Sequence, residues 1–309
     1  MNTKGSKHPR LIFFSHPRAT AMLPGVKLKG TTKGTAALSL CVLLVFIAAA
    51  LLSPWAYRLL HPHLAYPFHS YVDRSLMLAA LAAIPLFWRR FDIASWQEIG
   101  VKPEAKIGLA IGLAIALLST FVTLAIAIAA GGRILEGSAG WGSLGTLLLA
   151  AALVAPLEEL LFRGIIQTVL IRGTGPLVGI VLTSLFFALV HFIKVPSDFT
   201  PDPVTAGSGF TALGLAFAPF ADFHAIATRF LLLASVGGVL GLAAWRTGRL
   251  WLPIGLHAGW IIGAKLGGCL TAGIPNHWAS GDFTADPLSF AALALVALLL
   301  WKCPRFSIN

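Results

Sequence analysis

Charged residues are scarce in this chain of 309 residues. They make up 11% of the sequence, whereas soluble domains usually carry about 25%. Hydrophobic residues make up 57%, and the mean hydropathy is +0.83. This composition excludes an ordinary soluble globule and a disordered chain. The net charge of +11 would normally suggest an anionic partner, but the apolar runs indicate a membrane protein rather than a nucleic-acid-binding one.

Cysteine is also scarce, with three residues in the whole chain. Cys41, Cys269 and Cys303 lie far apart in the sequence and have none of the spacings of a metal-binding or disulfide framework. The sequence therefore predicts neither a disulfide-stapled fold nor a cysteine metal centre.

Long apolar runs dominate what is present. A bilayer-spanning helix needs about 20 mostly apolar residues, and backbone groups in lipid must find their hydrogen bonds internally. We count eight candidate spans at approximately 35–53, 75–88, 107–130, 144–170, 176–193, 226–245, 250–268 and 287–301. The runs do not alternate as the strands of a membrane β-barrel do. The sequence therefore predicts an all-α fold, a polytopic membrane helical bundle of about eight transmembrane helices.

The basic residues predict the orientation of these spans. If the N-terminus is cytoplasmic, sixteen of the 23 Lys and Arg residues fall on inside segments and four on outside segments, which instead carry seven acidic residues. This bias follows the positive-inside rule. We therefore expect both termini in the cytoplasm. The expected location is that of an integral membrane protein of a bacterial inner (plasma) membrane.

The chain divides into two predicted regions. Residues 1–34 contain seven basic and no acidic residues and form a cytoplasmic tail suited to an anionic lipid surface. Residues 35–305 form a single transmembrane helical domain, with its motif-bearing core at about 145–268. The segment 194–225 predicts an outer loop with a short re-entrant half-helix at 210–221.

The fourth span carries charges that topology does not explain. Glu158 and Glu159 lie near its middle, and burying carboxylates costs several kcal/mol each unless they are paired or protonated. Glu159 and Arg163 are four residues apart, so they share a helix face and can pair. Glu158 is turned by about 100° and must find another partner. It is a candidate general base, and the structural alternative is a helix-packing ion pair plus a protonated carboxyl.

Two histidines lie inside other spans. His191 follows Phe187 by one turn in the fifth span, and His257 is flanked by Gly255 and Gly259 in the seventh. Each histidine needs a polar partner in lipid, so one cluster shared with the glutamates is expected. The glycines predict close helix packing at His257. Counting from the predicted inside ends places His191 deeper than His257.

These segments together resemble the CPBP intramembrane endopeptidases, which include the type II CAAX prenyl endopeptidases and bacteriocin-processing or immunity proteins. The family motifs are Glu-Glu-x-x-x-Arg, Phe-x-x-x-His and His-x-x-x-Asn/Asp. Here they read Glu158-Glu159-Leu-Leu-Phe-Arg163, then Phe187-Ala-Leu-Val-His191, then His257 with Ile261 at the Asn/Asp position. The matched region runs from about 145 to 265.

The resemblance implies a glutamate-type protease acting within the membrane. It implies that Glu158 activates water with the help of His191, that His257 stabilises the oxyanion, and that Glu159, Arg163 and Phe187 support them. Ile261 removes one expected oxyanion donor. The alternatives are another donor, such as the Trp260 indole or Lys265, or a protein with weak or no catalytic activity.

Other readings of the same residues remain open. Glutamate and histidine are plausible zinc ligands, but the chain has no His-Glu-x-x-His, and we favour a site without metal or cofactor. The expected partners are the lipid bilayer and a membrane-bound or lipidated peptide or protein substrate, with no nucleic acid. The alternatives are a non-catalytic scaffold or immunity protein of the same fold and, less favoured, a proton relay or transporter.

Overall fold

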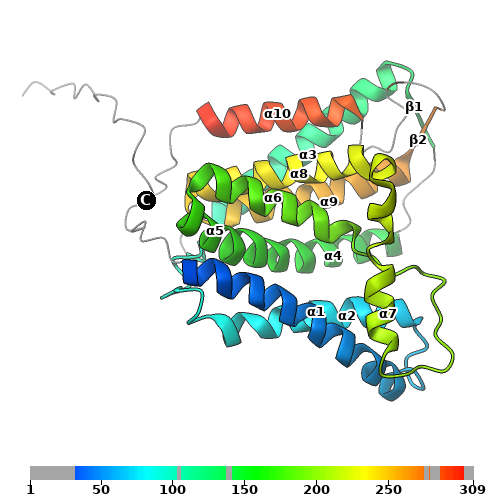
Figure 1. Cartoon of the computed structure of the whole chain (residues 1–309). Coiled ribbons are helices and arrows are strands. Elements are labelled where there is room, and N and C mark those ends of the chain that lie inside the picture. Colours follow the sequence, from blue (N-terminus) through cyan, green and yellow to red (C-terminus); the bar gives the residue numbers. More distant parts are fainter. Residues whose placement is uncertain (1–31, 103–105, 137–140, 275–277, 279–285, 303–309) are drawn as a thin grey trace, which may run out of the picture.

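The computed structural model describes residues 32–102, 106–136, 141–274, 278 and 286–302. Long helices lie side by side and form one bundle (Figure 1). The helices are α1 (Thr32–Leu60), α2 (Phe68–Phe87), α3 (Lys106–Ala129), α4 (Trp141–Glu159), η2 (Leu160–Ile166), α5 (Gln167–Thr174), α6 (Pro176–Phe192), α7 (Ser208–Leu215), η3 (Ala218–Asp222), α8 (Phe223–Thr247), α9 (Trp251–Leu270) and α10 (Pro287–Lys302). One antiparallel pair of short strands, β1 (Arg133–Leu135) and β2 (Thr271–Gly273), joins the end of α3 to the end of α9.

Every predicted span contains a helix, so the prediction of a helical membrane protein is confirmed. Five described stretches are long and apolar enough to cross a membrane: Lys33–Leu60, Phe68–Phe87, Ile107–Ala129, Leu144–Thr174 and Ser208–Thr247. Helices α6 and α10 are shorter apolar helices. Helix α9 matches the seventh predicted span but is not among these five stretches. The count of eight spans stays a prediction.

Segments that the alternation of spans predicts on the same side of the membrane lie at the same end of the bundle. At one end, Arg172 donates to the carbonyl of Asp92, the amide of Leu250 donates to the carbonyl of Gly100, and Arg246 donates to the carbonyl of Trp301. Segments predicted to lie inside therefore meet on the left of Figure 1. The β1–β2 pair and α7 lie at the opposite end. The cytoplasmic facing of the first end stays a prediction from charge.

Helices α3 and α9 pack backbone against backbone, because glycines line their contact. A Cβ atom built on Gly255 would lie 2.1 Å from the carbonyl oxygen of Leu109, and one on Gly112 would lie 2.3 Å from that of Leu252. A Cβ atom on Gly259 would lie 2.6 Å from the Cβ of Ala116. The prediction that glycines beside His257 permit close packing is confirmed. This contact fixes α9, and with it His257, against α3.

The predicted outer loop contains the helical segment that its sequence suggested. Helix α7 and the 3₁₀ turn η3 cover most of 210–221 and lead directly into α8. Helix α7 packs on α1, where a Cβ on Gly209 would lie 1.9 Å from the carbonyl oxygen of Ala50. Most of the predicted tail at 1–34 and the last residues of the predicted domain lie outside the described residues, and α1 begins at Thr32.

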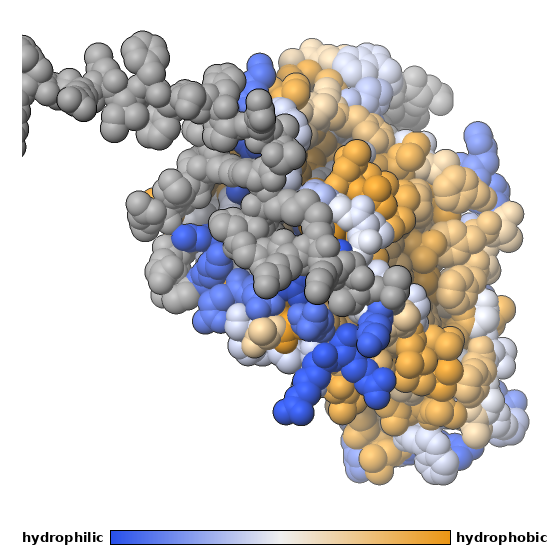
Figure 2. All heavy atoms as spheres, turned by 60° about the vertical axis from the view of Figure 1, so that its left-hand side comes forward, coloured by the Kyte–Doolittle hydropathy of each residue, from blue (hydrophilic) through white to orange (hydrophobic). Residues whose placement is uncertain are grey.

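The flanks of the bundle are apolar, as a lipid-facing surface requires. Large hydrophobic side chains are exposed along α1, for example Leu43 and Leu59. Figure 2 shows a continuous hydrophobic flank beside hydrophilic residues gathered at the end that comes forward. The core between helices includes a cluster around Phe162, Ile165 and Phe187, which lies directly beside the predicted site.

Candidate active site inside the bundle

The glutamate pair lies where the helix changes its geometry. Helix α4 contains Pro156 and ends at Glu159, and the next turns form a π-helix, η2, that carries Arg163 before α5 resumes normal α-helix. Proline lacks an amide hydrogen and disturbs the preceding turn. Single π-helical turns inside α-helices occur frequently at functional sites. The helix therefore presents its charged residues from an irregular stretch in mid-bundle.

Glu159 and Arg163 form a buried ion pair, as their spacing predicts. The Oε1 atom of Glu159 lies 2.7 Å from an Nη atom of Arg163, and both side chains are 0% exposed. The other Nη of Arg163 donates to the carbonyl of Gly237 in α8 at 3.3 Å. A buried charge pair is stable only when further hydrogen bonds satisfy it. Its second hydrogen bond links the glutamate-bearing helix to α8.

His257 joins the same pair from α9. Its Nδ1 atom lies 2.8 Å from Oε1 of Glu159, and the residue is buried. Since this oxygen already accepts from Arg163, the Nδ1 nitrogen is the donor. The Nε2 atom of His257 then faces Glu158, at 3.8 Å from its Oε2. His257 is thus held on one side by Glu159 and faces Glu158 with the other.

His191 approaches Glu158 in the same way from α6. Its Nδ1 lies 2.7 Å from the carbonyl oxygen of Phe187, which can only accept, and its Nε2 lies 3.8 Å from Oε2 of Glu158. The two histidines are therefore equally distant from Glu158. The expected difference in depth therefore does not keep the two histidines apart. Helix α9 continues unbroken past Pro253 in its first turn.

Exposure separates the two glutamates. The side chains of Glu158 and His191 are 28% and 30% exposed, whereas Glu159 is fully enclosed. The Oε2 atom of Glu158 is itself enclosed and makes no hydrogen bond to the described residues. Glu158 and the two Nε2 atoms lie too far apart for direct hydrogen bonds, and one water is the usual bridge across such a gap. The arrangement can hold and polarise a water.

Phe187 contacts most members of the cluster. Its ring lies below the guanidinium of Arg163, with 4.5 Å between the guanidinium carbon and the ring centroid. Its centroid lies 4.3 Å from the ring of His191 and 5.9 Å from that of His257. The side chain is 1% exposed. The structure therefore brings together all six predicted residues, with Phe187 packed at their centre.

Gln167 is a residue that the sequence reasoning missed. Its amide nitrogen donates to the carbonyl of Gly241 at 3.0 Å, one turn along α8 from the carbonyl that Arg163 binds. The spacing 159–163–167 was visible in the sequence as three polar residues at four-residue intervals within an apolar span. The three side chains form a polar seam along α4–α5, and its last two members bind α8.

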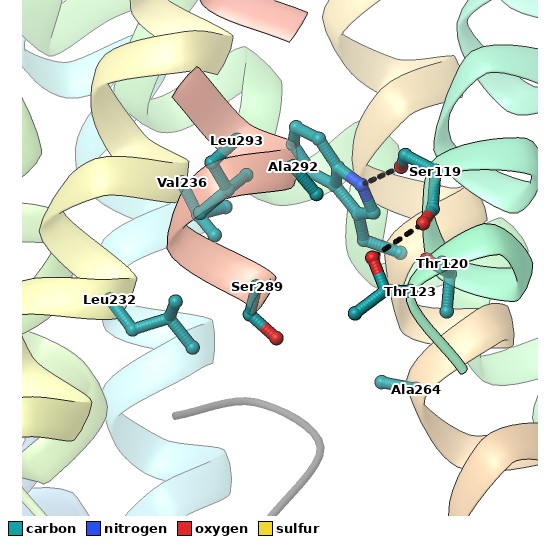
Figure 3. A pocket seen from close by; sticks show the side chains of 10 residues that line it. Ser119, Thr120, Thr123, Leu232, Val236, Ala264, Ser289, Ala292 and Leu293 are labelled. Atoms are coloured by element: carbon teal, nitrogen blue, oxygen red, sulfur yellow. Dashed lines mark hydrogen bonds between the residues drawn. The ribbon is translucent and has the colours of Figure 1, made fainter. Parts of the chain in front are cut away.

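The Trp260 indole does not replace the oxyanion donor that is missing at Ile261. The Nε1 of Trp260 donates to Oγ of Ser119 at 3.2 Å. Trp260 lines a separate cavity of about 90 Å³. Figure 3 shows Ser119, Thr120 and Thr123 on α3 facing Leu232 and Val236 on α8 and Ser289 on α10 across this cavity. Lys265, the other candidate donor, is exposed on α9.

A metal site was the less favoured alternative. Among the residues that the structure describes, no group of three or more His, Cys, Asp and Glu side chains is arranged to hold a metal ion. The prediction that the protein needs no metal or cofactor stays a prediction.

The fold and the site define a class of protein. It is a polytopic helical membrane protein with a charged, histidine-containing cluster inside its bundle. Residues 140–262 match the family model described as type II CAAX prenyl endopeptidase Rce1-like. This match confirms the resemblance to the CPBP family over the segment that contains the two complete motifs and His257 of the third, and the model is that of a protease family. Comparison with curated proteins and with solved structures finds no significant match.

Proposed function

We propose that this protein is an intramembrane endopeptidase that uses a glutamate-activated water to hydrolyse a peptide bond near a membrane-associated or lipidated segment. The observation that supports this most directly is the convergence of the Nε2 atoms of His191 and His257 on one oxygen of Glu158, each at 3.8 Å. These groups come from three different helices. The family match and the apolar bundle support the same class of reaction.

In the proposed reaction, Glu158 takes a proton from a water that it shares with Nε2 of His191. The water oxygen forms a bond to the scissile carbonyl carbon, and the carbonyl oxygen becomes an oxyanion. His257 in its protonated form donates to that oxyanion, and its charge is stabilised by Glu159 on Nδ1. The C–N bond then breaks as the proton held by Glu158 moves to the leaving nitrogen. One water is consumed and no other reactant is needed.

The substrate proposed is a peptide or protein that is itself membrane-bound or lipidated. The cluster is surrounded by helices with apolar outer faces, and only Glu158 and His191 keep substantial exposure. A segment that reaches this depth must tolerate an apolar environment. The family description adds prenylated substrates as one class of such segments.

A second candidate is a non-catalytic membrane scaffold or immunity protein of the same fold, and Ile261 is the observation that favours it. Loss of one oxyanion donor typically lowers the rate by about 10²–10³. In this case the buried Glu159–Arg163–His257 network would serve helix packing alone.

The deciding experiment compares membrane peptides by mass spectrometry in cells that express the wild type, Glu158→Gln or Glu136→Gln. Glu136 is an exposed carboxylate at the far end of the bundle, so this variant controls for the same chemical change. We expect products that appear with the wild type and with Glu136→Gln and disappear with Glu158→Gln. Identical peptide profiles for all three proteins, at equal membrane levels, would favour the scaffold.

A further inference from the structure

A groove outside the candidate active site lies beside the end of α2. It has a volume of about 730 Å³ and is lined by apolar residues from the last turns of α2, by Trp88 and Trp96, and by Arg89 and Arg90. The two indole rings lie side by side, with centroids 4.8 Å apart. The arginines can bind a negative headgroup. The tryptophans next to them offer a surface that is apolar with one polar N–H group.

The segment that forms this groove is firmly attached to the bundle. Phe91, Ile93 and Ile99 are at most 4% exposed and belong to the cluster that also contains Phe162 and Phe187. Arg89 and Arg90, by contrast, are exposed directly before these anchors. The backbone is therefore fixed while the two guanidinium groups face outward, so the charged groove is preformed.

The charge of the groove is not neutralised within the described chain. The side chains of Arg89 and Arg90 make no hydrogen bond or ion pair to the residues that the structure describes, although their backbones bond to Asp92 and Phe87. The nearby carboxylate of Glu98 is taken by Arg172 at 2.6 Å, which also binds the carbonyl of Asp92. Two adjacent guanidiniums with no partner among the described residues attract an anion, and a phosphate matches their geometry.

Two occupants can be compared on charge. The N-terminal region 1–34 contains seven basic residues and no acidic ones, so it has the wrong sign to fill the groove. An anionic phospholipid has the opposite charge, and its acyl chains would lie along the exposed apolar flank next to Leu86, which is 76% exposed. The groove is at the end of the bundle where the predicted inside segments meet, and basic residues there attract anionic headgroups.

We infer that this groove binds the headgroup phosphate of an anionic phospholipid between Arg89 and Arg90, with Trp88 and Trp96 packed against its glycerol region. The groove lies outside the catalytic cluster, and lipid binding there needs no peptidase activity. It would fix the level of α2 and of the 88–100 segment in the bilayer. Because that segment packs on the core beside Phe162, a bound lipid would also hold the glutamate-bearing helix in place.

The test is native mass spectrometry of the full-length protein in a non-ionic detergent, titrated with phosphatidylglycerol or with phosphatidylcholine of the same acyl chains. We expect wild-type protein to retain one phosphatidylglycerol at least about tenfold more tightly than phosphatidylcholine. Arg89→Gln with Arg90→Gln should lower the phosphatidylglycerol affinity on the order of 10–30-fold and leave phosphatidylcholine binding unchanged. Arg89→Lys with Arg90→Lys should retain more of the affinity than the glutamine pair.

The matched control is Lys33→Gln with Lys302→Gln, which removes two exposed positive charges from the same end of the bundle. We expect this variant to change phosphatidylglycerol affinity by less than about threefold. Trp96→Ala should weaken binding of both lipids. Equal losses of affinity in Arg89→Gln with Arg90→Gln and in the control Lys33→Gln with Lys302→Gln would overturn the proposed site. So would the absence of any preference for phosphatidylglycerol, or its displacement by millimolar inorganic phosphate with no effect of Trp96→Ala, which would indicate a free-anion site.

Discussion

A single oxygen atom, Oε1 of Glu159, lies 2.8 Å from Nδ1 of His257 and 2.7 Å from an Nη atom of Arg163. One carboxylate thus joins α4–η2 to α9, and through Arg163 it also joins them to the Gly237 carbonyl in α8. This contact gives the two glutamates different roles. Glu159 holds the helices and the histidine, and Glu158 is left facing the two Nε2 atoms.

Replacing Glu158 by glutamine should abolish the proposed peptidase activity without unfolding the protein. Glutamine keeps the size of the side chain but cannot accept a proton from water, and general-base catalysis typically contributes about 10²–10⁴-fold. Cleavage of a membrane-tethered reporter measures the effect, with Glu136→Gln as the control. Full cleavage by Glu158→Gln, at normal membrane levels, would contradict the assigned role.

Breaking the buried ion pair on one side should destabilise the bundle more than removing both charges. Arg163→Met alone leaves Glu159 enclosed without its cation, which typically costs about 3–5 kcal/mol. The double variant Glu159→Gln with Arg163→Met removes both charges and should recover most of that loss. Denaturant unfolding in detergent provides the measurement. A double variant no more stable than Arg163→Met would mean that the two charges are not energetically coupled.

Restoring an oxyanion donor at Ile261 should raise the activity. We expect Ile261→Asn to increase the cleavage rate at least about tenfold, because one such donor is typically worth about 10²–10³. Ile262→Asn introduces the same polar group one position along α9, turned by about 100°, and should not increase the rate. Reporter cleavage by the two variants decides the matter. Equal rates for Ile261→Asn and the wild type would show that the family's Asn/Asp position has no catalytic use here.

The packing of α9 on α3 should depend on a single hydrogen atom at Gly255. A methyl group there would meet the carbonyl oxygen of Leu109 at 2.1 Å, and backbone atoms cannot rotate away. We expect Gly255→Ala to lower the thermal unfolding midpoint clearly. Gly268→Ala, on the same helix with nothing within 4 Å of its Cβ position, should leave it unchanged or raise it slightly. Matching midpoints for both variants would be inconsistent with tight packing at Gly255.

The contact between Gln167 and α8 can be tested with a double-mutant cycle. A Cβ on Gly241 would lie 2.6 Å from Oε1 of Gln167, so Gly241→Ala should destabilise the protein while Gln167 is present. Gln167→Ala removes the obstructing oxygen at the cost of about 1 kcal/mol for its hydrogen bond. The double variant should therefore be more stable than the sum of the two single effects predicts. Strict additivity would argue against this contact.

Much of the fold and the candidate site could be predicted from local features of the sequence. Apolar runs predicted the helices, because the bilayer requires spans of that length with internal hydrogen bonds. The spacing of Glu159 and Arg163 predicted their ion pair, since residues four apart share a helix face. Gly255 and Gly259 predicted close packing because a missing side chain permits it. Two complete short motifs and half of a third predicted the family match that covers 140–262.

Relations between helices could not be obtained in this way. Residue counting put His191 and His257 at different depths, yet both lie 3.8 Å from Glu158, because the levels at which α6 and α9 begin are set by packing. The partner of His257 was likewise a tertiary outcome, since the apolar sequence around it contains no acid. The sequence by itself determined which residues are costly to bury and which helix faces they share. The tertiary structure decided which of those residues meet, because only the packing of α4, α6, α8 and α9 around Phe187 brings the two glutamates and the two histidines together.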